Sequence, residues 1–513
     1  MKKSTILILL ILTYLNIDIQ SQENKLIINA DLGKYTISKH IYGHFSEHLG
    51  HCIYGGIWVG ENSPIPNTNG IRNDVLEALK KLEIPNLRWP GGCFADEYHW
   101  MDGIGPRENR PKIVNTNWGG VVEDNSFGTH EFLNFCELIG TEPYLSMNVG
   151  SGTVEEMAKW VEYVNSDGES PMANLRRKNG REKPWNVKFF GIGNESWGCG
   201  GEMRPEYYAD VFRRYSTYCR SYGNNRPYKI ASGSSDADYR WTETLMQNIG
   251  YRMNGISLHY YTVKGWVGSK GSATNFTRDE YISTLERCMG IEKILQGHIN
   301  IMDRYDPEKR IALIVDEWGT WFDVEPGTNP GFLFQQNTMR DAFVAGITLN
   351  ILNKYCDRVK MANIAQLVNV LQAIILTDND KMVLTPTYHV FDLYKVHKEA
   401  IYLPSNLTTE YYEIGNKKLP ALNVSASKSA DGSINISIVN INPDKNIPLQ
   451  CEIRGQNITK VSGRILTSKN INDHNTFDNP NLIKITDFNN AKINKNILSI
   501  EVPSKSVVVL KVN

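Results

Sequence analysis

The chain has 513 residues, of which 55 are Lys or Arg and 56 are Asp or Glu, and its formal net charge at pH 7 is -1. This balance excludes the basic surface that nucleic acids and anionic membranes require, so we expect neither among the partners. The length exceeds one ordinary domain, and 41% hydrophobic with 22% charged residues is typical of a globular protein with a large core. We therefore expect two domains.

The N-terminus carries the first predicted element, an export signal. Met1-Lys2-Lys3 is followed by an apolar run from Ile6 to Leu12, which is too short for a comfortable membrane span. We interpret residues 1–22 as a signal peptide and expect an exported, periplasmic or extracellular bacterial protein without membrane contact after cleavage. The cleavage site is poorly marked, and an uncleaved anchor stays open.

Residues 37–385 alternate between strand-like and helical patterns. Helical periodicity occurs at 73–82, at 129–139 before the capping glycine Gly140, and after Thr153, which pairs with Glu156 in a capping box. The strand-like segments are 41–47, 86–90, 143–149, 187–195, 228–232, 255–261, 311–318 and 360–368. Eight strands alternating with helices predict an α/β fold, a (β/α)₈ TIM barrel with its active site at the carboxyl ends of the strands.

Two of these strands end in acidic residues. Residues 187–195 form an apolar run that ends in Asn194 and Glu195, and residues 311–318 end similarly in Asp316 and Glu317. A buried strand followed by a polar turn would explain either one alone. Two such ends in one barrel instead predict that both glutamates face the same cavity.

The pattern changes after residue 385. Short alternating segments at 433–439, 449–453, 498–502 and 506–512 are separated by turn residues, which predicts a C-terminal antiparallel β-sandwich, jelly-roll-like, over residues 386–513. We expect the β-rich segment at 23–36 to join this sandwich. No low-complexity linker separates the domains, so close packing of the two is expected.

The cysteines and histidines give no clear metal or disulfide pattern. The cysteines are scattered rather than clustered, and we interpret them as buried free thiols, with pairing left open by the predicted export. They are Cys52, Cys93, Cys136, Cys199, Cys219, Cys288, Cys356 and Cys451. His44, His48 and His51 have no second ligand cluster, so hydrogen-bonding roles are favoured and we expect no metal and no cofactor.

Two facing carboxyl groups suit glycosidic bond hydrolysis, which needs a proton for the leaving oxygen and a group that captures the sugar carbon. We assign Glu195 as the acid/base, kept protonated by a neighbouring negative charge, and Glu317 as the ionised nucleophile. A carboxyl separation of about 5 to 5.5 Å would mean retention of configuration, and one above about 6.5 Å would mean inversion.

Several motifs resemble α-L-arabinofuranosidases of glycoside hydrolase family 51. They are 41–50 (IYGHFSEHLG), 53–57 (IYGGI), 88–92 (RWPGG), 193–195 (GNE), 316–318 (DEW) and 365–369 (AQLVN), spread in order over residues 37–370. The resemblance implies the same barrel and sandwich, a retaining mechanism, the same two glutamates, and a homo-oligomer.

The resemblance also implies furanose-binding residues. Glu47 corresponds to a carboxylate that accepts sugar hydroxyls, although an ion pair with Arg88 is an alternative, and Cys93 stands where many members have Asn. A thiol makes a weaker polar contact than an amide. Trp100 is a further candidate pocket wall that could equally belong to the core. The remaining substrate-binding candidates are Asn194, His259, Tyr261, Trp321 and Gln366.

The expected activity is therefore exo-acting, retaining α-L-arabinofuranosidase activity, with arabinan, arabinoxylan or arabino-oligosaccharides as the partners that are cleaved. An endo-β-glucanase or xylanase on the same machinery is one alternative, since an endo enzyme needs an open cleft where an exo enzyme needs a closed pocket. A carbohydrate-binding protein without activity is the other.

Overall fold

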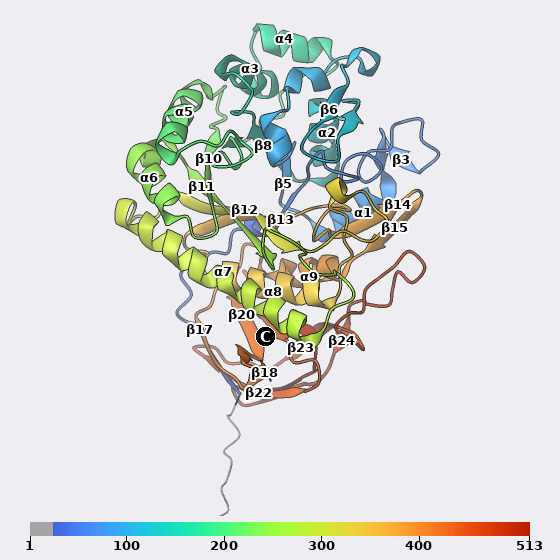
Figure 1. The fold of residues 1–513 in the computed structure, drawn as a ribbon. Coiled ribbons are helices and arrows are strands. Elements are labelled where there is room, and N and C mark those ends of the chain that lie inside the picture. The colour runs from blue at the N-terminus through green and yellow to red at the C-terminus, as the bar shows by residue number, and fades with distance from the viewer. Residues whose placement is uncertain (1–23) are drawn as a thin grey trace, which may run out of the picture.

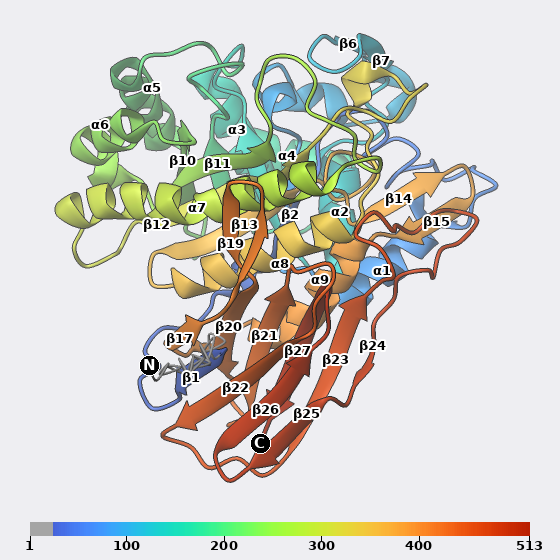
Figure 2. The same ribbon diagram turned by 60° about the horizontal axis from the view of Figure 1, so that its bottom comes forward.

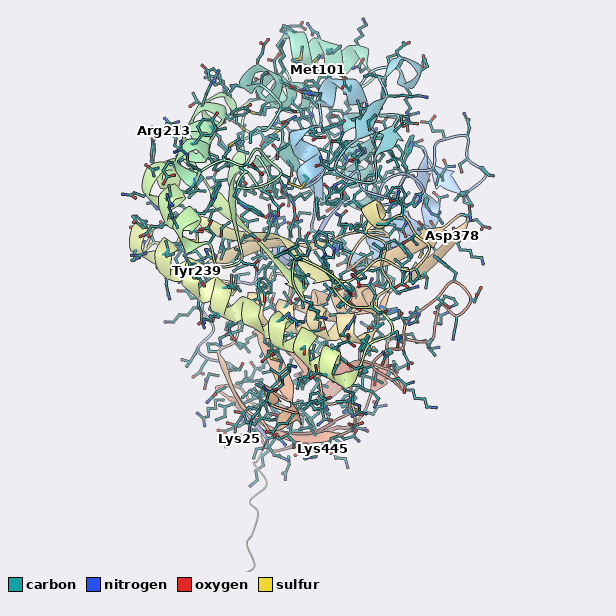
Figure 3. The ribbon with its side chains drawn as sticks, viewed as in Figure 1. Lys25, Met101, Arg213, Tyr239, Asp378 and Lys445 are labelled. Carbon is teal, nitrogen blue, oxygen red and sulfur yellow. A yellow bond between two sulfur atoms is a disulfide. The ribbon has the colours of Figure 1, made fainter. Side chains whose placement is uncertain are left out.

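The computed structural model describes residues 24–513; the predicted signal peptide, residues 1–22, lies outside this range. A barrel forms the upper part of the molecule in Figure 1, and a layer of strands lies below it. Lys25 and Lys445 mark the strand-rich end in Figure 3, and Met101 marks the opposite end. The predicted barrel with a C-terminal, mostly antiparallel strand domain is confirmed.

Eight parallel strands close the barrel, as predicted. The first is shorter than expected because residues 39–42 form the 3-10 helix η1 (Lys39–Tyr42), so pairing starts at Gly43. Strands β11 and β12 extend furthest and carry side chains to the barrel mouth. The barrel strands are β2 (Gly43–Phe45), β5 (Asn86–Trp89), β8 (Glu142–Met147), β9 (Phe189–Ile192), β10 (Tyr228–Ser235), β11 (Gly255–Val263), β12 (Ala312–Trp321) and β13 (Val359–Ala365).

Helices cover the outside of the barrel (Figure 1). The first two have the predicted bounds, and Gly140 ends α2 in the left-handed conformation that glycine adopts without cost. Thr153 caps α3 by accepting from the Glu156 amide, which is one half of the predicted capping box. The helices are α1 (Asn73–Leu82), α2 (Thr129–Ile139), α3 (Val154–Asn165), α4 (Pro171–Lys178), α5 (Pro205–Tyr218), α6 (Tyr239–Ile249), α7 (Arg278–Tyr305), α8 (Met339–Lys354) and α9 (Pro386–Tyr394).

A short 3-10 helix and three hairpins lie in the loops at the barrel mouth. The 3-10 helix η2 (Cys93–Asp96) follows β5 directly and brings Cys93 to the cavity described below. Three small hairpins pair β3 with β4, β6 with β7, and β14 with β15. Their strands are β3 (Asn67–Thr68), β4 (Ile71–Arg72), β6 (Ile113–Asn115), β7 (Val121–Glu123), β14 (Ile375–Asp378) and β15 (Lys381–Leu384).

The C-terminal strands form two sheets, ordered β17-β1-β22-β26-β25 and β16-β20-β21-β27-β23-β24, beside the hairpin of β18 and β19. Strand β1 (Lys25–Asn29) lies antiparallel to β17 and parallel to β22, so the N-terminal segment is part of the first sheet. The other strands are β16 (Ile401–Tyr402), β17 (Ser405–Thr408), β18 (Tyr411–Ile414), β19 (Lys417–Pro420), β20 (Leu422–Lys428), β21 (Ile434–Asn440), β22 (Ile447–Arg454), β23 (Val461–Thr467), β24 (Thr486–Phe488), β25 (Ala491–Asn494), β26 (Ile497–Val502) and β27 (Ser506–Val512).

Helix α8 lies between the barrel and the sandwich (Figure 2). It is buried on every side, from Met339 to Asn353, and contacts β12 on one side and β20, β21 and β27 on the other. The helix is therefore enclosed by its neighbours on all sides, polar residues such as Arg340 and Asp341 included. At Gly346 the approach is close, since a Cβ there would lie 2.9 Å from Val439 Cγ2. The two parts of the chain therefore share one core.

Candidate active site

A cavity of about 470 Å³ opens at the carboxyl ends of the barrel strands. Most of the residues predicted for the site line it, from six different strands or the loops after them. His259 is buried and contacts Glu195 of the lining, and Asn194 is buried and bonds to Arg88, which does not line the cavity. The predicted residues in the lining are Glu47, Cys93, Glu195, Tyr261, Glu317, Trp321 and Gln366.

Glu317 lies within strand β12 and is held by two donors. The Arg88 guanidinium donates to Oε1 at 2.7 Å, and the Tyr261 hydroxyl donates to Oε2 at 2.8 Å. Burial alone would lower the pKa of Arg88, but the carboxylates of Asp316 and Glu317 outweigh it and raise that pKa above its usual range. A cation and a phenol hydroxyl therefore both donate to the Glu317 carboxyl group, one to each oxygen.

Glu195 lies three residues beyond the end of β9, in the left-handed region of backbone space with φ of 37°. Its Oε1 accepts from His259 Nδ1 at 2.8 Å, and His259 Nε2 lies 3.2 Å from Asp316 Oδ1. Burial alone would lower the pKa of His259, but Glu317, Asp316 and Glu195 together raise it to about 10. Both ring nitrogens therefore carry protons, and Oε2 is the oxygen of Glu195 left free to exchange one.

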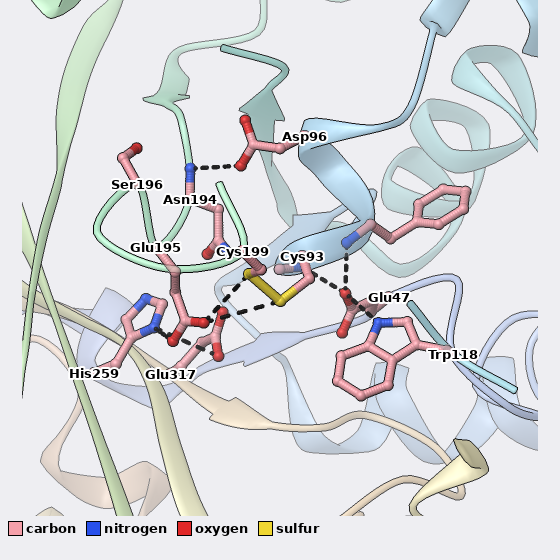
Figure 4. Close-up of a disulfide and its surroundings, with 12 residues drawn as sticks. Glu47, Cys93, Asp96, Trp118, Asn194, Glu195, Ser196, Cys199, His259 and Glu317 are labelled. Atoms are coloured by element: carbon pink, nitrogen blue, oxygen red, sulfur yellow. Dashed lines mark hydrogen bonds and ion pairs between the residues drawn. A yellow bond between two sulfur atoms is a disulfide. The ribbon is translucent and has the colours of Figure 1, made fainter. Parts of the chain in front are cut away.

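The two glutamates converge on one cavity. One carboxylate oxygen of Glu195 lies within 4.8 Å of one of Glu317 (Figure 4). This bound is compatible with the separation of about 5 to 5.5 Å that the two carboxyl groups of a retaining glycosidase show.

Glu47 forms the opposite wall of the cavity. Its Oε1 accepts from the backbone amides of Gly92 and Phe94 at 2.9 and 3.1 Å and from Trp118 Nε1 at 3.0 Å. Its Oε2 accepts from Gln366 Nε2 at 3.1 Å. Burial, and next the charge of Glu317, raise the pKa of Glu47 to about 7 despite these donors. Glu47 is thus a fixed acceptor whose remaining lone pairs face the cavity.

The alternative role for Glu47, an ion pair with Arg88, does not occur. Arg88 donates to Glu317 and, through Nη2, to Asn194 Oδ1 at 2.5 Å. This leaves Asn194 Nδ2 buried without a partner among residues 24–513, and Gln366 Oε1 is in the same condition. Buried polar atoms normally have partners, so an open acceptor in the cavity lining and an open donor behind Gly92 of that lining suit a polyhydroxylated ligand.

Cys93 and Cys199 form a disulfide across the cavity wall, with Cα atoms 5.5 Å apart (Figure 4). The expectation of free thiols is wrong for these two, because 106 residues separate them and the fold alone brings them together. The interpretation of Cys93 as a weakly polar thiol is wrong for the same reason. The expectation of buried free thiols is confirmed for the other cysteines, which are Cys52, Cys136, Cys219, Cys288, Cys356 and Cys451.

Aromatic walls of the cavity were only partly predicted. Trp321 lines it, whereas Trp100 is buried, stacks on Trp160 and belongs to the core. Trp118, Trp197 and Trp266 also line the cavity but were missed, since they lie outside strands and follow no periodic pattern. Arg88 was missed as a partner of Glu317; its position at the end of β5 was the available signal.

Two groups of side chains have the spacing of metal ligands in the described part of the chain. They are Cys93, Glu195 and Cys199, and Glu195, His259 and Glu317. In the first group the sulfurs are bonded to each other, and in the second His259 is protonated, so neither offers its usual donor electrons. His44, His48 and His51 belong to neither group.

A parallel barrel with two carboxyl groups facing each other across a small polar cavity defines a glycoside hydrolase, as predicted. Residues 78–278 match the model of the α-L-arabinofuranosidase 1 domain, and residues 316–506 match that of the α-L-arabinofuranosidase C-terminal domain. The chain is also 61% identical over 485 residues to a Bacteroides ovatus protein named intracellular exo-α-L-arabinofuranosidase, covering 94% of each chain. It belongs to the α-L-arabinofuranosidases of glycoside hydrolase family 51, which confirms the resemblance.

Solved structures agree with this membership. The family 51 arabinofuranosidase of Xanthomonas axonopodis pv. citri is 49% identical, with a TM-score of 0.95 over 96% of this chain and 100% of that chain. An arabinose complex of the α-L-arabinofuranosidase of Thermotoga maritima is 33% identical, with a TM-score of 0.81 over 95% and 99% of the two chains.

The predicted export is contradicted by the name of the Bacteroides ovatus relative, which is an intracellular enzyme at 61% identity. That prediction rested on the basic start Met1-Lys2-Lys3 and the apolar run from Ile6 to Leu12, beside a poorly marked cleavage site. An apolar N-terminal run is a pattern of composition, and it does not by itself establish transport. Within residues 24–513, no helix is long and apolar enough to cross a membrane.

Proposed function

We propose that the enzyme is an exo-acting, retaining α-L-arabinofuranosidase that releases terminal non-reducing arabinofuranose by double displacement. The observation that carries this proposal is the pair of carboxyl groups with oxygens within 4.8 Å, the group of Glu317 held by Arg88 and Tyr261 and that of Glu195 by His259. Exo action is supported by the name of the Bacteroides ovatus relative, and an arabinose ligand by the complex of the Thermotoga maritima enzyme.

In the first step Glu317 attacks the anomeric carbon while Glu195 gives its proton to the departing oxygen. The glycosidic bond breaks, a covalent glycosyl-enzyme forms on Glu317, and Glu195 becomes a carboxylate. In the second step a water attacks the same carbon, Glu195 takes its proton, and Glu317 is released. Two inversions at one carbon give net retention. His259 holds Oε1 of Glu195 throughout, so Oε2 performs both proton transfers.

The other proposed roles concern the sugar ring. Glu47 accepts bonds from ring hydroxyls, Asn194 Nδ2 donates to the 2-hydroxyl, and Gln366 contributes its free carbonyl. Trp321 stands against Tyr261 with ring centroids 5.2 Å apart and closes one side of the cavity. Cys93, tied into its disulfide, contributes shape rather than a hydrogen bond. The substrates are arabinan, arabinoxylan or arabino-oligosaccharides.

Two measurements test this proposal: the anomeric configuration of the first product and the range of substrates that are cleaved. Proton NMR of early hydrolysis should show α-arabinofuranose first, and added methanol should yield methyl α-L-arabinofuranoside. Aryl arabinofuranoside, arabinan and arabinoxylan should release free arabinose, while aryl xyloside and β-glucan should not. Initial β-product would refute retention, and internal cleavage of glucan or xylan chains would favour an endo-acting enzyme instead.

We also propose that the enzyme is a homo-oligomer, which rests on family resemblance. Light scattering coupled to size-exclusion chromatography tests this directly. A mass of about 58 kDa, that of one chain, would refute it.

A further inference from the structure

The disulfide touches the reactive oxygen of the acid/base. Glu195 Oε2 lies 3.5 Å from Cys199 Sγ and 3.9 Å from Cys93 Sγ (Figure 4). A disulfide sulfur carries no proton, so these are van der Waals contacts and not hydrogen bonds. Because His259 occupies Oε1, the sulfurs flank the oxygen that exchanges its proton with the substrate.

The backbone around Glu195 needs external support. A non-glycine residue at φ of 37° costs about 1 to 3 kcal/mol and persists only where its surroundings fix it. The loop after Glu195 folds back on itself, since the amides of Gly198 and Gly200 both donate to the Glu195 carbonyl, at 2.7 and 3.1 Å. Cys199 lies between these two glycines, so the disulfide holds this loop directly.

The disulfide is one of two ties from η2 to this loop. At the other end of the same short helix, Asp96 Oδ2 accepts a hydrogen bond from the backbone N–H of Asn194 at 3.1 Å. Asp96 and Cys93 therefore hold the chain on both sides of Glu195. The Asp96 tie is buried, whereas Cys199 is exposed to solvent.

We propose that the Cys93–Cys199 disulfide is a positioning element for Glu195, and that its reduction selectively impairs proton donation to the leaving group. A dithiol would transfer two electrons and two protons to the two sulfurs, leaving two thiols and an oxidised, cyclic disulfide of the reagent. Each new S–H group can donate to Oε2 and compete with the proton transfer that Oε2 performs, while the loop loses its covalent tie. This inference rests on the proposed role of Glu195.

Reduction and thiol labelling can be confined to the Cys93–Cys199 disulfide. Every other cysteine is buried, and burial raises the pKa of the Cys52, Cys219 and Cys288 thiols to about 12. Thiolate is the form that reacts with disulfides and alkylating reagents. Mild dithiothreitol treatment of the native enzyme should therefore expose two titratable thiols and no more.

The experiment compares wild type with Cys93→Ala, Cys199→Ala and the double variant. We expect kcat/KM to fall about tenfold on an arabino-oligosaccharide, part of the 10²- to 10⁴-fold that general acid catalysis supplies. On dinitrophenyl arabinofuranoside, whose dinitrophenolate leaves without a proton, kcat/KM of Cys199→Ala should change less than about twofold. Cys93→Ala also changes the cavity wall, so Cys199→Ala is the variant that carries this comparison. Each single variant should lose at least as much as the double on the oligosaccharide, because either change breaks the bond and each single variant keeps one thiol that can compete for Oε2. Cys451→Ala, in strand β22, is the matched control and should match wild type on both substrates.

Wild type reduced with dithiothreitol should show the same selective loss and recover on reoxidation, which provides the test even if a variant does not fold. Equal losses on both substrates, or no loss on either, would overturn the inference. Assaying Glu195→Ala beside these variants distinguishes a failure of the disulfide proposal from a failure of the assignment of Glu195. If Glu195→Ala shows leaving-group dependence and the cysteine variants do not, the disulfide proposal alone fails; if it shows none, the assignment of Glu195 fails.

Discussion

The ends of strands β12 and β9 present the two glutamates in different ways. Glu317 lies inside β12, in register with His259 of β11, and the strand continues to Trp321. Glu195 lies beyond the last residue of β9, Ile192, on a backbone that only surrounding contacts stabilise. The sheet therefore fixes the group proposed to form a covalent bond, and loops fix the group proposed to exchange protons.

The exposure of the two side chains follows the same division. The Glu317 side chain is 7% exposed and the Glu195 side chain is 20% exposed. The proposed nucleophile is held by fixed donors away from water, whereas the proposed acid/base must accept a proton from water once per turnover. Four predictions test this division, beginning with the largest expected effect.

Replacing Glu317 with Gln should remove nearly all activity. The amide keeps the shape of the side chain but cannot attack the sugar carbon, so we expect kcat to fall by about 10⁴-fold or more on every substrate. Initial rates on aryl arabinofuranoside and on arabinan measure this. A variant with more than a few per cent of wild-type activity would place the nucleophile elsewhere.

Replacing Glu195 with Ala should give a loss that depends on the leaving group. We expect kcat/KM to fall by about 10²- to 10⁴-fold on arabino-oligosaccharides and by less than about tenfold on dinitrophenyl arabinofuranoside. Added azide should speed turnover of the second substrate and yield an arabinosyl azide, since no base is then needed. If Glu195→Ala lost activity on every substrate and Glu317→Gln showed the dependence on the leaving group, the two roles would be exchanged.

Replacing Tyr261 with Phe should remove one donor from Glu317 and leave Arg88 in place. A hydrogen bond to a charged group contributes about 1.5 to 3 kcal/mol, so kcat should fall about 10- to 100-fold with little change in KM. Tyr260→Phe is the matched control, because the Tyr260 hydroxyl donates to the Arg287 carbonyl instead. Equal effects of the two changes would mean that the loss is one of folding.

The smallest effect concerns stability and pH. The pKa of His259 is raised to about 10 in the folded protein, so its ion pairs stabilise the fold fully below its unfolded value of about 6.5 and are lost as the pH rises through about 10. The melting temperature of His259→Gln should therefore fall less than that of wild type between pH 7 and 10. If the melting temperatures of wild type and His259→Gln fell equally between pH 7 and 10, His259 would not be protonated in the folded protein.

The features of the fold that were predictable from sequence are those with a local signal. Periodicity identified α1 and α2 to the residue, and apolar runs identified all eight barrel strands. Because the carboxyl ends of parallel strands share one side of a barrel, the same runs placed Glu195 and Glu317 together. Residues 41–42 were assigned to a strand but form part of η1, since apolar residues there face the core in either conformation.

Contacts between distant segments were not predictable in this way. Cys93 and Cys199 look like other scattered cysteines until the fold sets them 5.5 Å apart at Cα. Arg88 was weighed as a partner of Glu47, but it pairs with Glu317 because the barrel directs its side chain across the interior. Composition likewise cannot tell a wall tryptophan such as Trp321 from a core one such as Trp100.

The burial of α8 on every side also determines how the protein unfolds. The same helix supplies apolar surface to β12 and to β20, β21 and β27, so deleting the sandwich would leave the surface that faces those three strands in water. The sandwich is thus no detachable accessory module. Calorimetry of the intact chain should show both halves melting together in a single cooperative transition, and a truncated barrel should aggregate.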